Sequence, residues 1–219
     1  SYIDMLRRNM VDGVIVNSLN IGAEAYAEMG LSLVGIDCDL GEASVQIASD
    51  SYSIGELATR RLIDDGCSRI LCLRSNSRMR MPANKRTDAY LDVVEQAGLP
   101  ALVREVEFVK PDDEKSAVVA KILDENPDID GIFAGDDTMA AICLNVMKQR
   151  GLSAPGDIKV VGADGARRTM TFMPDLTTVR QDIDRIGELA AQSIIALING
   201  EKPESNIKLP VELIEGKTA

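Results

Sequence analysis

Four short apolar segments of this sequence each end on a small side chain that carries hydrogen-bond acceptors. These side chains are Asn17, Asp37, Asp136 and Asp164. The segments are too short for helices and are bounded by turn residues, so we expect buried parallel strands. In open α/β sheets, ligands bind beyond the carboxyl ends of the strands. The four acceptors are therefore expected to converge on one cleft, where they could bind a metal, perform acid–base chemistry or accept hydrogen bonds from a polyol.

A structural role competes with each of these chemistries. Asp and Asn also favour turns and helix caps, and Asp137, directly before a helix expected from Thr138, fits a cap best. A metal site is disfavoured because the sequence has no DxDxDG loop or other tight cluster. A glycosidase pair of carboxyl groups stays open. The absence of GxGxxG and GxxxxGK[ST] motifs argues against dinucleotide and P-loop nucleotide binding.

A basic segment supplies donors that would suit a polyol. Residues 78–86 include Arg78, Arg80, Lys85 and Arg86, and they follow a strand expected at 69–73. Arginine offers a rigid fork of donors that fits neighbouring hydroxyl groups. The alternative interpretation is a solvated basic loop.

The composition excludes several classes of protein. The chain has 219 residues and a formal net charge of −11, and such an acidic surface repels the phosphate backbone of nucleic acids. The absence of histidine removes the Ser-His-Asp and Cys-His arrangements and the commonest metal ligand. The four cysteines form no CxxC pair, so we expect buried reduced thiols, with a Cys67–Cys72 metal loop as the alternative. No segment is long and apolar enough to cross a bilayer.

Strand and helix patterns alternate along the chain, which favours parallel sheets with right-handed crossovers. Ser53 and Glu56 have the spacing of a capping box, and the helix they open is expected to end at Gly66. Strands are expected at 11–16, 31–36, 69–73, 102–108, 131–134, 157–164 and 176–179. Helices are expected at 53–65, 84–97, 112–126, 138–150 and 182–199, and an extended segment at 207–214.

Several of these segments together resemble the effector-binding part of the lactose-repressor family of bacterial transcription regulators. The resemblance is strongest at 155–164 and at 174–182, followed by Ile186 and Gly187. Further matching segments are 11–16, 62–70, 86–90, 131–137 and 209–214. They cover essentially the whole chain in order.

The resemblance implies a two-lobed α/β fold like that of the periplasmic sugar-binding proteins (type I), with parallel sheets flanked by helices and three crossovers. The N-terminal lobe would comprise 1–48 and 181–207 and would be incomplete at its N-terminus; the C-terminal lobe would comprise 49–180 and 208–219. A ligand would bind between the lobes. Matched motif by motif, the ligand-contacting positions are Asn17, Asp37, Arg86, Asp136 and Asp164, with Phe108 as a stacking aromatic and Gln181 at a crossover.

Two kinds of departure from the family accompany this resemblance. The family has an aromatic and a second acid where this chain has Ala163 and Gly165, which we expect to open the pocket floor. It has glycine at Ala89 and often histidine at Cys67. The family also begins with a DNA-binding headpiece, a hinge and two strand–helix units of the first lobe, which these residues do not match.

The resemblance implies a non-enzymatic, cytoplasmic sensing region of a sugar-responsive regulator. It would bind a small-molecule effector, a sugar or related polyol, with no cofactor, no metal, no catalytic residue and no membrane partner. It would contact DNA only through the headpiece. A secreted solute-binding protein of a transporter and a carbohydrate-active enzyme are the competing interpretations.

The expected helix at 138–150 has apolar residues on more than one face, including Met139, Ile142, Leu144, Val146 and Met147. That is more than one core-facing stripe requires. By resemblance the helix lies in a homodimer interface, so Leu144→Glu and Met147→Glu are expected to weaken self-association without unfolding the chain.

Overall fold

The computed structural model describes residues 11–17, 30–38, 40–41, 44–76, 83–107 and 109–219. The chain divides into two compact units, Ser1–Asp50 with Asp182–Pro210 and Ser51–Gln181 with Val211–Ala219. It therefore passes three times from one unit to the other, after Asp50, after Gln181 and after Pro210. The sequence-based lobe boundaries were 48, 180 and 207.

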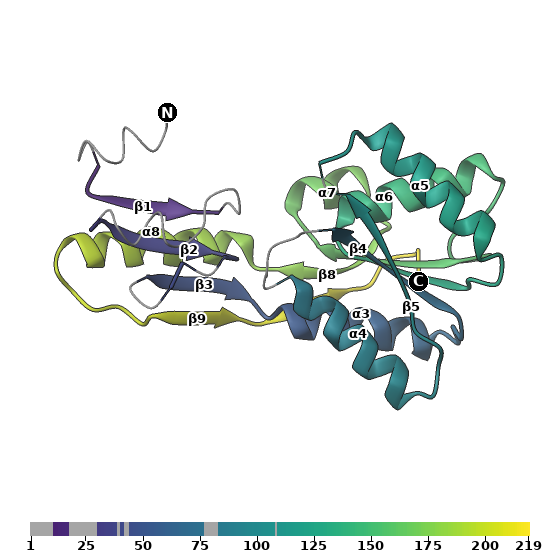
Figure 1. The fold of residues 1–219 in the computed structure, drawn as a ribbon, viewed down its shortest axis with the longest axis horizontal. Helices are drawn as coiled ribbons and strands as arrows, with labels where there is room; N and C mark the ends of the chain where they lie inside the picture. The colour runs from purple at the N-terminus through teal and green to yellow at the C-terminus, as the bar shows by residue number, and fades with distance from the viewer. Residues whose placement is uncertain (1–10, 18–29, 39, 42–43, 77–82, 108) are drawn as a thin grey trace. The chain divides into compact units, whose positions relative to one another are not determined.

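Unit 1 is built on a parallel sheet with the strand order β1-β2-β3-β9 (Figure 1). The strands are Gly13–Val16, Ser32–Ile36, Val45–Ser49 and Asn206–Leu209, respectively. Helix α8 (Ile183–Ile198) packs Ile186 and Ala190 against Val34, Val45 and Ile47 of this sheet. β3 was not expected from the sequence, although its residues alternate between buried and half-buried.

Unit 2 is built on a six-stranded sheet with the order β10-β8-β7-β6-β4-β5. β10 is antiparallel to β8, and the other pairs are parallel. In chain order the strands are β4 (Ile70–Asn76), β5 (Leu102–Glu107), β6 (Gly131–Ala134), β7 (Lys159–Asp164), β8 (Thr177–Gln181) and β10 (Val211–Ile214).

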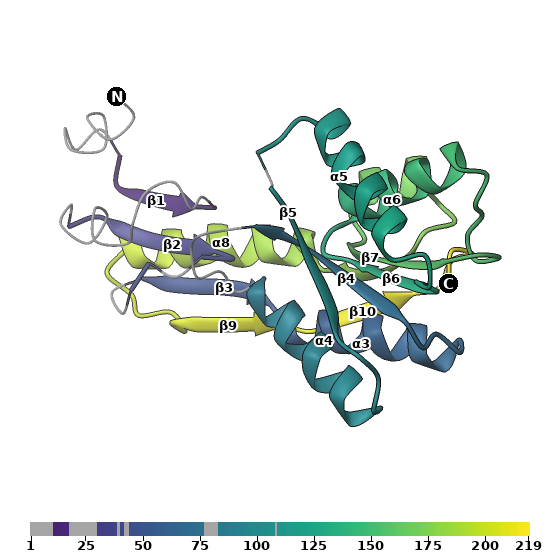
Figure 2. The ribbon, with the colours of Figure 1, turned by 45° about the vertical axis from the view of Figure 1, so that its right-hand side comes forward.

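Helices cover both faces of this sheet, with α3 and α4 on one face and α5 and α6 on the other (Figure 2). Because side chains alternate along a strand, β4 sends Leu71 and Leu73 to the core beside α5 and α6, and Ile70 and Cys72 to the core beside α3 and α4. The helices are α3 (Ser51–Asp64), α4 (Asn84–Gln96), α5 (Asp112–Glu125), α6 (Asp137–Gln149) and the short α7 (Arg167–Phe172).

Two local predictions are corrected by the structure. Helix α3 begins at Ser51, two residues before the predicted cap at Ser53, and Glu56 pairs with Arg60 on the same helix at 3.0 Å. The predicted capping box is therefore wrong. The closing segment divides at Pro210 into β9 and β10, which belong to different sheets. Proline has no amide hydrogen to donate to a ladder, so the division falls there.

The helix at 138–150, observed as α6, has apolar residues on two sides because it packs on two partners within its own unit. Met139, Ile142, Val146 and Met147 are all buried in the core shared with the sheet and α5. Leu144 is half-buried and packs against the same core. The expectation that Met147→Glu would spare the fold is therefore wrong.

All four cysteines are buried and free, which confirms the prediction of buried thiols. Among the helices of the described residues, none is long and apolar enough to span a membrane.

Candidate functional site

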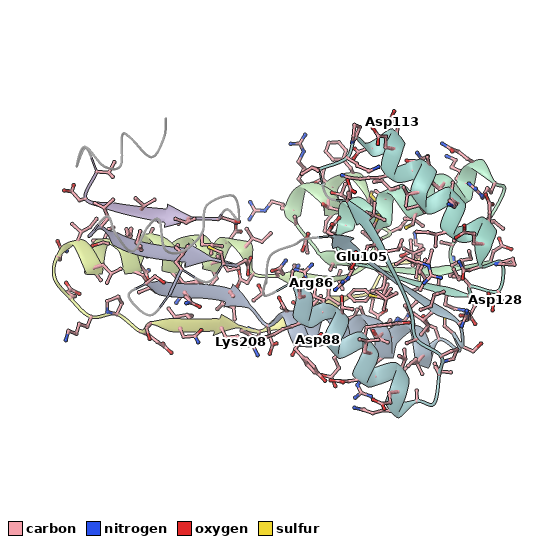
Figure 3. The ribbon with its side chains drawn as sticks, in the orientation of Figure 1. Arg86, Asp88, Glu105, Asp113, Asp128 and Lys208 are labelled. Atoms are coloured by element: carbon pink, nitrogen blue, oxygen red, sulfur yellow. The ribbon has the colours of Figure 1, made fainter. Side chains whose placement is uncertain are left out.

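Arg86 lies in the first turn of α4, near the carboxyl ends of β6 and β7 (Figure 3). Its guanidinium donates from Nη1 to the carbonyl oxygen of Gly135 at 2.5 Å and from Nη2 to Oδ1 of Asp164 at 3.3 Å. The Arg86 side chain is only 12% exposed. Arg86 thus joins α4 to the ends of two neighbouring strands and pairs with Asp164, a residue far from it in the sequence.

Asp164 is the last residue of β7 and is paired in register with Arg180 of β8. Its φ is 118°, a conformation that costs a non-glycine residue about 1–3 kcal/mol and that is typical of functional sites. Oδ1 accepts a second hydrogen bond, from Nε2 of Gln181 at 2.6 Å. Within the described part of the chain, no group donates to Oδ2. The side chain is 32% exposed, so Oδ2 is an acceptor available to a ligand.

Burial raises the pKa of the Asp164 carboxyl to about 6. The Arg86 guanidinium lowers this pKa, the negative charges of Asp137 and Asp136 raise it, and the hydrogen bond from Gln181 lowers it. Desolvation therefore outweighs the ion pair. Asp164 titrates closer to neutral pH than an ordinary aspartate.

The two adjacent carboxylates after β6 differ from the roles that the sequence suggested. Asp136 is the N-cap of α6, and its Oδ1 accepts from the backbone N–H of Met139 at 2.7 Å. Asp137, predicted to be the cap, lies in the first turn of α6 instead. The assignment of the cap to Asp137 is wrong, and Asp136 fills that role while remaining half-buried at the site's edge.

Asp137 is a buried carboxylate that joins the first turn of α6 to β8 and to the turn after β7. Oδ1 accepts from the Thr178 hydroxyl at 2.6 Å, and Oδ2 accepts from the Gly165 N–H at 2.8 Å. Burial raises its pKa, while these two hydrogen bonds lower it. A Cβ on Gly162 would lie 2.5 Å from Oδ1, so this carboxylate requires glycine there. The network fixes the turn that immediately follows Asp164.

The predicted site residues lie in unit 1, in unit 2 or outside the described residues. Asn17 is exposed directly after β1, and Asp37 is half-buried directly after β2 with φ 51°, both in unit 1. Phe108 and the arginines at 78 and 80 lie outside the described residues. In unit 2, the structure brings Arg86, Asp164 and Gln181 into one hydrogen-bonded group.

The sequence suggested that the small residues beside Asp164 open the floor of a pocket. The packing around these residues gives another reason for their small size. Ala163 is fully buried in the core that contains Val161 and Val179. Gly165 has φ 57°, and a Cβ there would lie 2.6 Å from Cβ of Arg180. Ala163 therefore faces packed side chains, and Gly165 is required by its backbone.

Sequence reasoning missed two members of this group, the Gly135 carbonyl and the Asp137 network. A backbone carbonyl leaves no mark in a sequence. The network did leave a mark, because Thr178 is a polar residue in an expected strand, and its buried hydroxyl needs a partner, which is Asp137.

The arrangement can bind a polyhydroxylated or otherwise polar small molecule. A guanidinium offers donors, and a carboxylate with one unused oxygen offers acceptors for hydroxyl protons. In the part of the chain that the structure describes, no group of three or more Cys, Asp or Glu residues is placed to hold a metal ion.

Comparisons with known proteins show what the chain is similar to. Residues 59–219 match the family model described as periplasmic binding protein-like domain. The sucrose operon repressor of Pediococcus pentosaceus is 33% identical over 220 residues, which cover all of this chain and 67% of that protein. The ribose operon repressor of Halalkalibacterium halodurans is 30% identical over 219 residues, 99% of this chain and 65% of that protein.

A solved structure of the transcriptional regulator CelR in complex with cellobiose superposes with a TM-score of 0.89 at 28% identity, covering all of this chain and 69% of that one. The chain thus spans about two thirds of the length of the curated relatives that it matches.

Proposed function

This chain belongs to the lactose-repressor family, whose periplasmic binding protein-like domain it contains, and we propose that it is the sugar-sensing region of a bacterial transcription regulator. The observation that carries the proposal is the group formed by Arg86, Asp164 and Gln181 at the carboxyl ends of the strands of unit 2. The relatives are named as repressors of sucrose and ribose operons, which favours a regulator over a secreted solute-binding protein or an enzyme.

In this proposal the effector is a sugar or related polyol, with hydroxyl oxygens accepting from Arg86 and a hydroxyl proton donated to Oδ2 of Asp164. Asn17, Asp37, Asp136 and Phe108 are proposed as further contacts. The protein would act in the cytoplasm, as a homodimer, and would reach DNA through a headpiece outside these 219 residues.

Gln181 supports a route from ligand to response. It is the last residue of unit 2 before the chain passes to unit 1, and it donates to the same Oδ1 that Arg86 contacts. A ligand that binds Asp164 would strengthen or weaken the hydrogen bond between Gln181 and Asp164, at the point where the chain leaves unit 2. If the ligand prefers one conformation of this segment, ligand binding can be coupled to DNA binding.

The test has two stages. Thermal-shift screening against sucrose, ribose and cellobiose identifies a ligand, because a ligand at a hundred times its Kd adds about 2.7 kcal/mol to stability. Calorimetry then compares wild type with Arg86→Ala, Arg86→Lys and Asp164→Asn. A charge-assisted hydrogen bond contributes about 1.5–3 kcal/mol, so each change is expected to weaken binding by roughly one to two powers of ten. Lysine is expected to fail because it lacks the planar fork.

Arg150→Ala is a matched control. Arg150 also donates to one carbonyl oxygen, that of Ala120, and to one carboxylate, that of Asp124. It should leave affinity unchanged. Wild-type affinity in both Arg86→Ala and Asp164→Asn would exclude these residues from the binding site.

A further inference from the structure

Helices α3 and α4 lie side by side (Figure 2). Gly55, a buried residue of α3, lies directly against the backbone of Arg86 in α4. A Cβ placed on Gly55 would lie 2.1 Å from the carbonyl oxygen of Arg86, 2.8 Å from its carbonyl carbon and 2.9 Å from its Cα. All three atoms are backbone atoms of one residue. The first turn of α4 therefore packs directly against Gly55.

This contact cannot be relieved by a side-chain rotation. Real Cβ atoms essentially never come closer than 3.0 Å to another heavy atom, whereas a Cβ on residue 55 would lie 2.1 Å from the Arg86 carbonyl oxygen. An alanine at 55 would therefore have to increase this distance by about 0.9 Å. The atoms that must move include the Cα that carries the arginine side chain. The displacement is thus passed to the base of that side chain.

The guanidinium has little tolerance for such a displacement. Its Nη2 lies 3.3 Å from Oδ1 of Asp164, close to the limit of a hydrogen bond, while Nη1 is held at 2.5 Å by the Gly135 carbonyl. Its Nε is buried and has no hydrogen-bond partner among the described residues. The Arg86 guanidinium is thus largely buried, and the position of the first turn of α4 determines where it lies.

We propose that Gly55 is a positioning residue of the binding site: the absence of a side chain at this contact sets the place of Arg86 and hence its pairing with Asp164. The inference rests on the proposed function only for its consequence in ligand binding. The geometric part, that Gly55 determines the Arg86–Asp164 pair, is testable without a ligand.

The ligand-free test follows the titration of the Asp164 carboxyl by carbon NMR. The Arg86 charge lowers the pKa of Asp164, so Arg86→Ala is expected to raise the midpoint by about one unit. Gly55→Ala is expected to produce about half of that rise or more, and to add nothing in the Arg86→Ala background. A Gly55→Ala midpoint equal to that of wild type, or an additional rise in the Arg86→Ala background, would overturn the proposal.

Gly187→Ala is the matched control. Gly187 also lies inside a helix, α8, but a Cβ there meets nothing within 4 Å. It should leave the Asp164 midpoint unchanged and raise stability, because alanine favours a helix more than glycine does. If Gly55→Ala is only marginally folded, all variants are titrated in trimethylamine N-oxide, which favours the compact state. Failure to fold even there would overturn the proposal by making the contact a folding requirement.

The ligand arm uses sucrose, ribose and cellobiose in a double-mutant cycle. Gly55→Ala is expected to weaken binding severalfold in the wild-type background and by less than about twofold in the Arg86→Ala background. Equal losses in both backgrounds would contradict positioning through Arg86. If no sugar binds wild type, the proposed sugar-sensing function fails, whereas the titration still decides the role of Gly55.

Discussion

At the scale of single residues, Asp164 combines features that stability alone would not select. It adopts φ 118°, is only partly exposed, and has one oxygen held by Arg86 and Gln181. Its pKa of about 6 shows that burial penalises its charge more than the arginine compensates. A strained, destabilised carboxylate of this kind is expected where a ligand supplies the missing partner.

Asp164→Asn should make stability less sensitive to pH. A carboxyl whose pKa is raised from 3.8 to about 6 on folding binds its proton more tightly in the folded chain, so its stabilisation is present at low pH and is lost as pH rises from about 4 to about 6. Relative to Asp164→Asn, wild type should lose on the order of 2–3 kcal/mol over this range. Urea unfolding of both proteins at pH 4 and pH 7 measures the difference.

Asp157→Asn serves as a control of opposite sign. Hydrogen bonds from the Ser153 hydroxyl and amide lower the pKa of Asp157. Relative to this variant, wild type should gain stability as pH rises through the acidic range. An Asp164→Asn difference that is the same at pH 4 and pH 7 would show that Asp164 is not destabilised by its charge.

At the scale of helices and strands, local sequence signals predicted most elements because they act over a few residues. Apolar runs marked the strands, and Gly66 and Gly151 ended helices with φ values of 87° and 74°. β3 was missed because Val45–Ser49 is short and contains polar residues, and α7 because its six residues bury no side chain and so carry no periodic pattern. The cap was assigned to Asp137 instead of Asp136 because the helix begins one residue earlier than predicted, and a shift of one residue changes which carboxylate is the N-cap.

Helix α6 gives a prediction about packing. Met147 is 1% exposed, whereas Leu144 is half-buried at the margin of the core. Met147→Glu would bury a carboxylate without a partner and should cost more than about 4 kcal/mol, while Leu144→Glu should cost about 1–2 kcal/mol. Asn145→Glu, at an exposed position on the same helix, should stay within about 0.5 kcal/mol of wild type. Urea unfolding curves rank the three.

Sedimentation of the same variants measures self-association, whereas their unfolding curves measure the packing of α6 in its own unit. The apolar residues of α6 that suggested a homodimer are accounted for by the core of unit 2, so they no longer argue for one. Of the three variants, only Leu144→Glu replaces a partly exposed apolar residue and is also expected to fold, so it is the variant that can test self-association through α6. A stable Met147→Glu variant would contradict the observed packing of α6.

At the scale of the whole molecule, the strand residues next to the points where the chain passes between units pair with one another within each sheet. In unit 1, Ser49 of β3 pairs with Leu209 of β9, and Lys208 forms an ion pair with Asp50 at 2.7 Å (Figure 3). In unit 2, Gln181 of β8 pairs with Val211 of β10. Alternating strands and helices predicted the parallel sheets, but no local signal shows which strands from distant parts of the chain become neighbours. That information came from the family resemblance.

The net charge of −11 makes a prediction for these 219 residues taken together. Binding to DNA without sequence preference depends on cations that neutralise phosphates and release counterions, and 24 lysines and arginines against 35 acidic residues give the opposite balance. The 219-residue chain should therefore bind random duplex DNA no better than an unrelated acidic protein of similar size, even at low salt, where electrostatic attraction is greatest. Mobility-shift titrations on a mixed-sequence duplex, with a basic DNA-binding protein as the positive control, measure this. A shift that weakens steeply with added salt would show that this region contacts phosphates itself, and DNA recognition would then not require a separate headpiece.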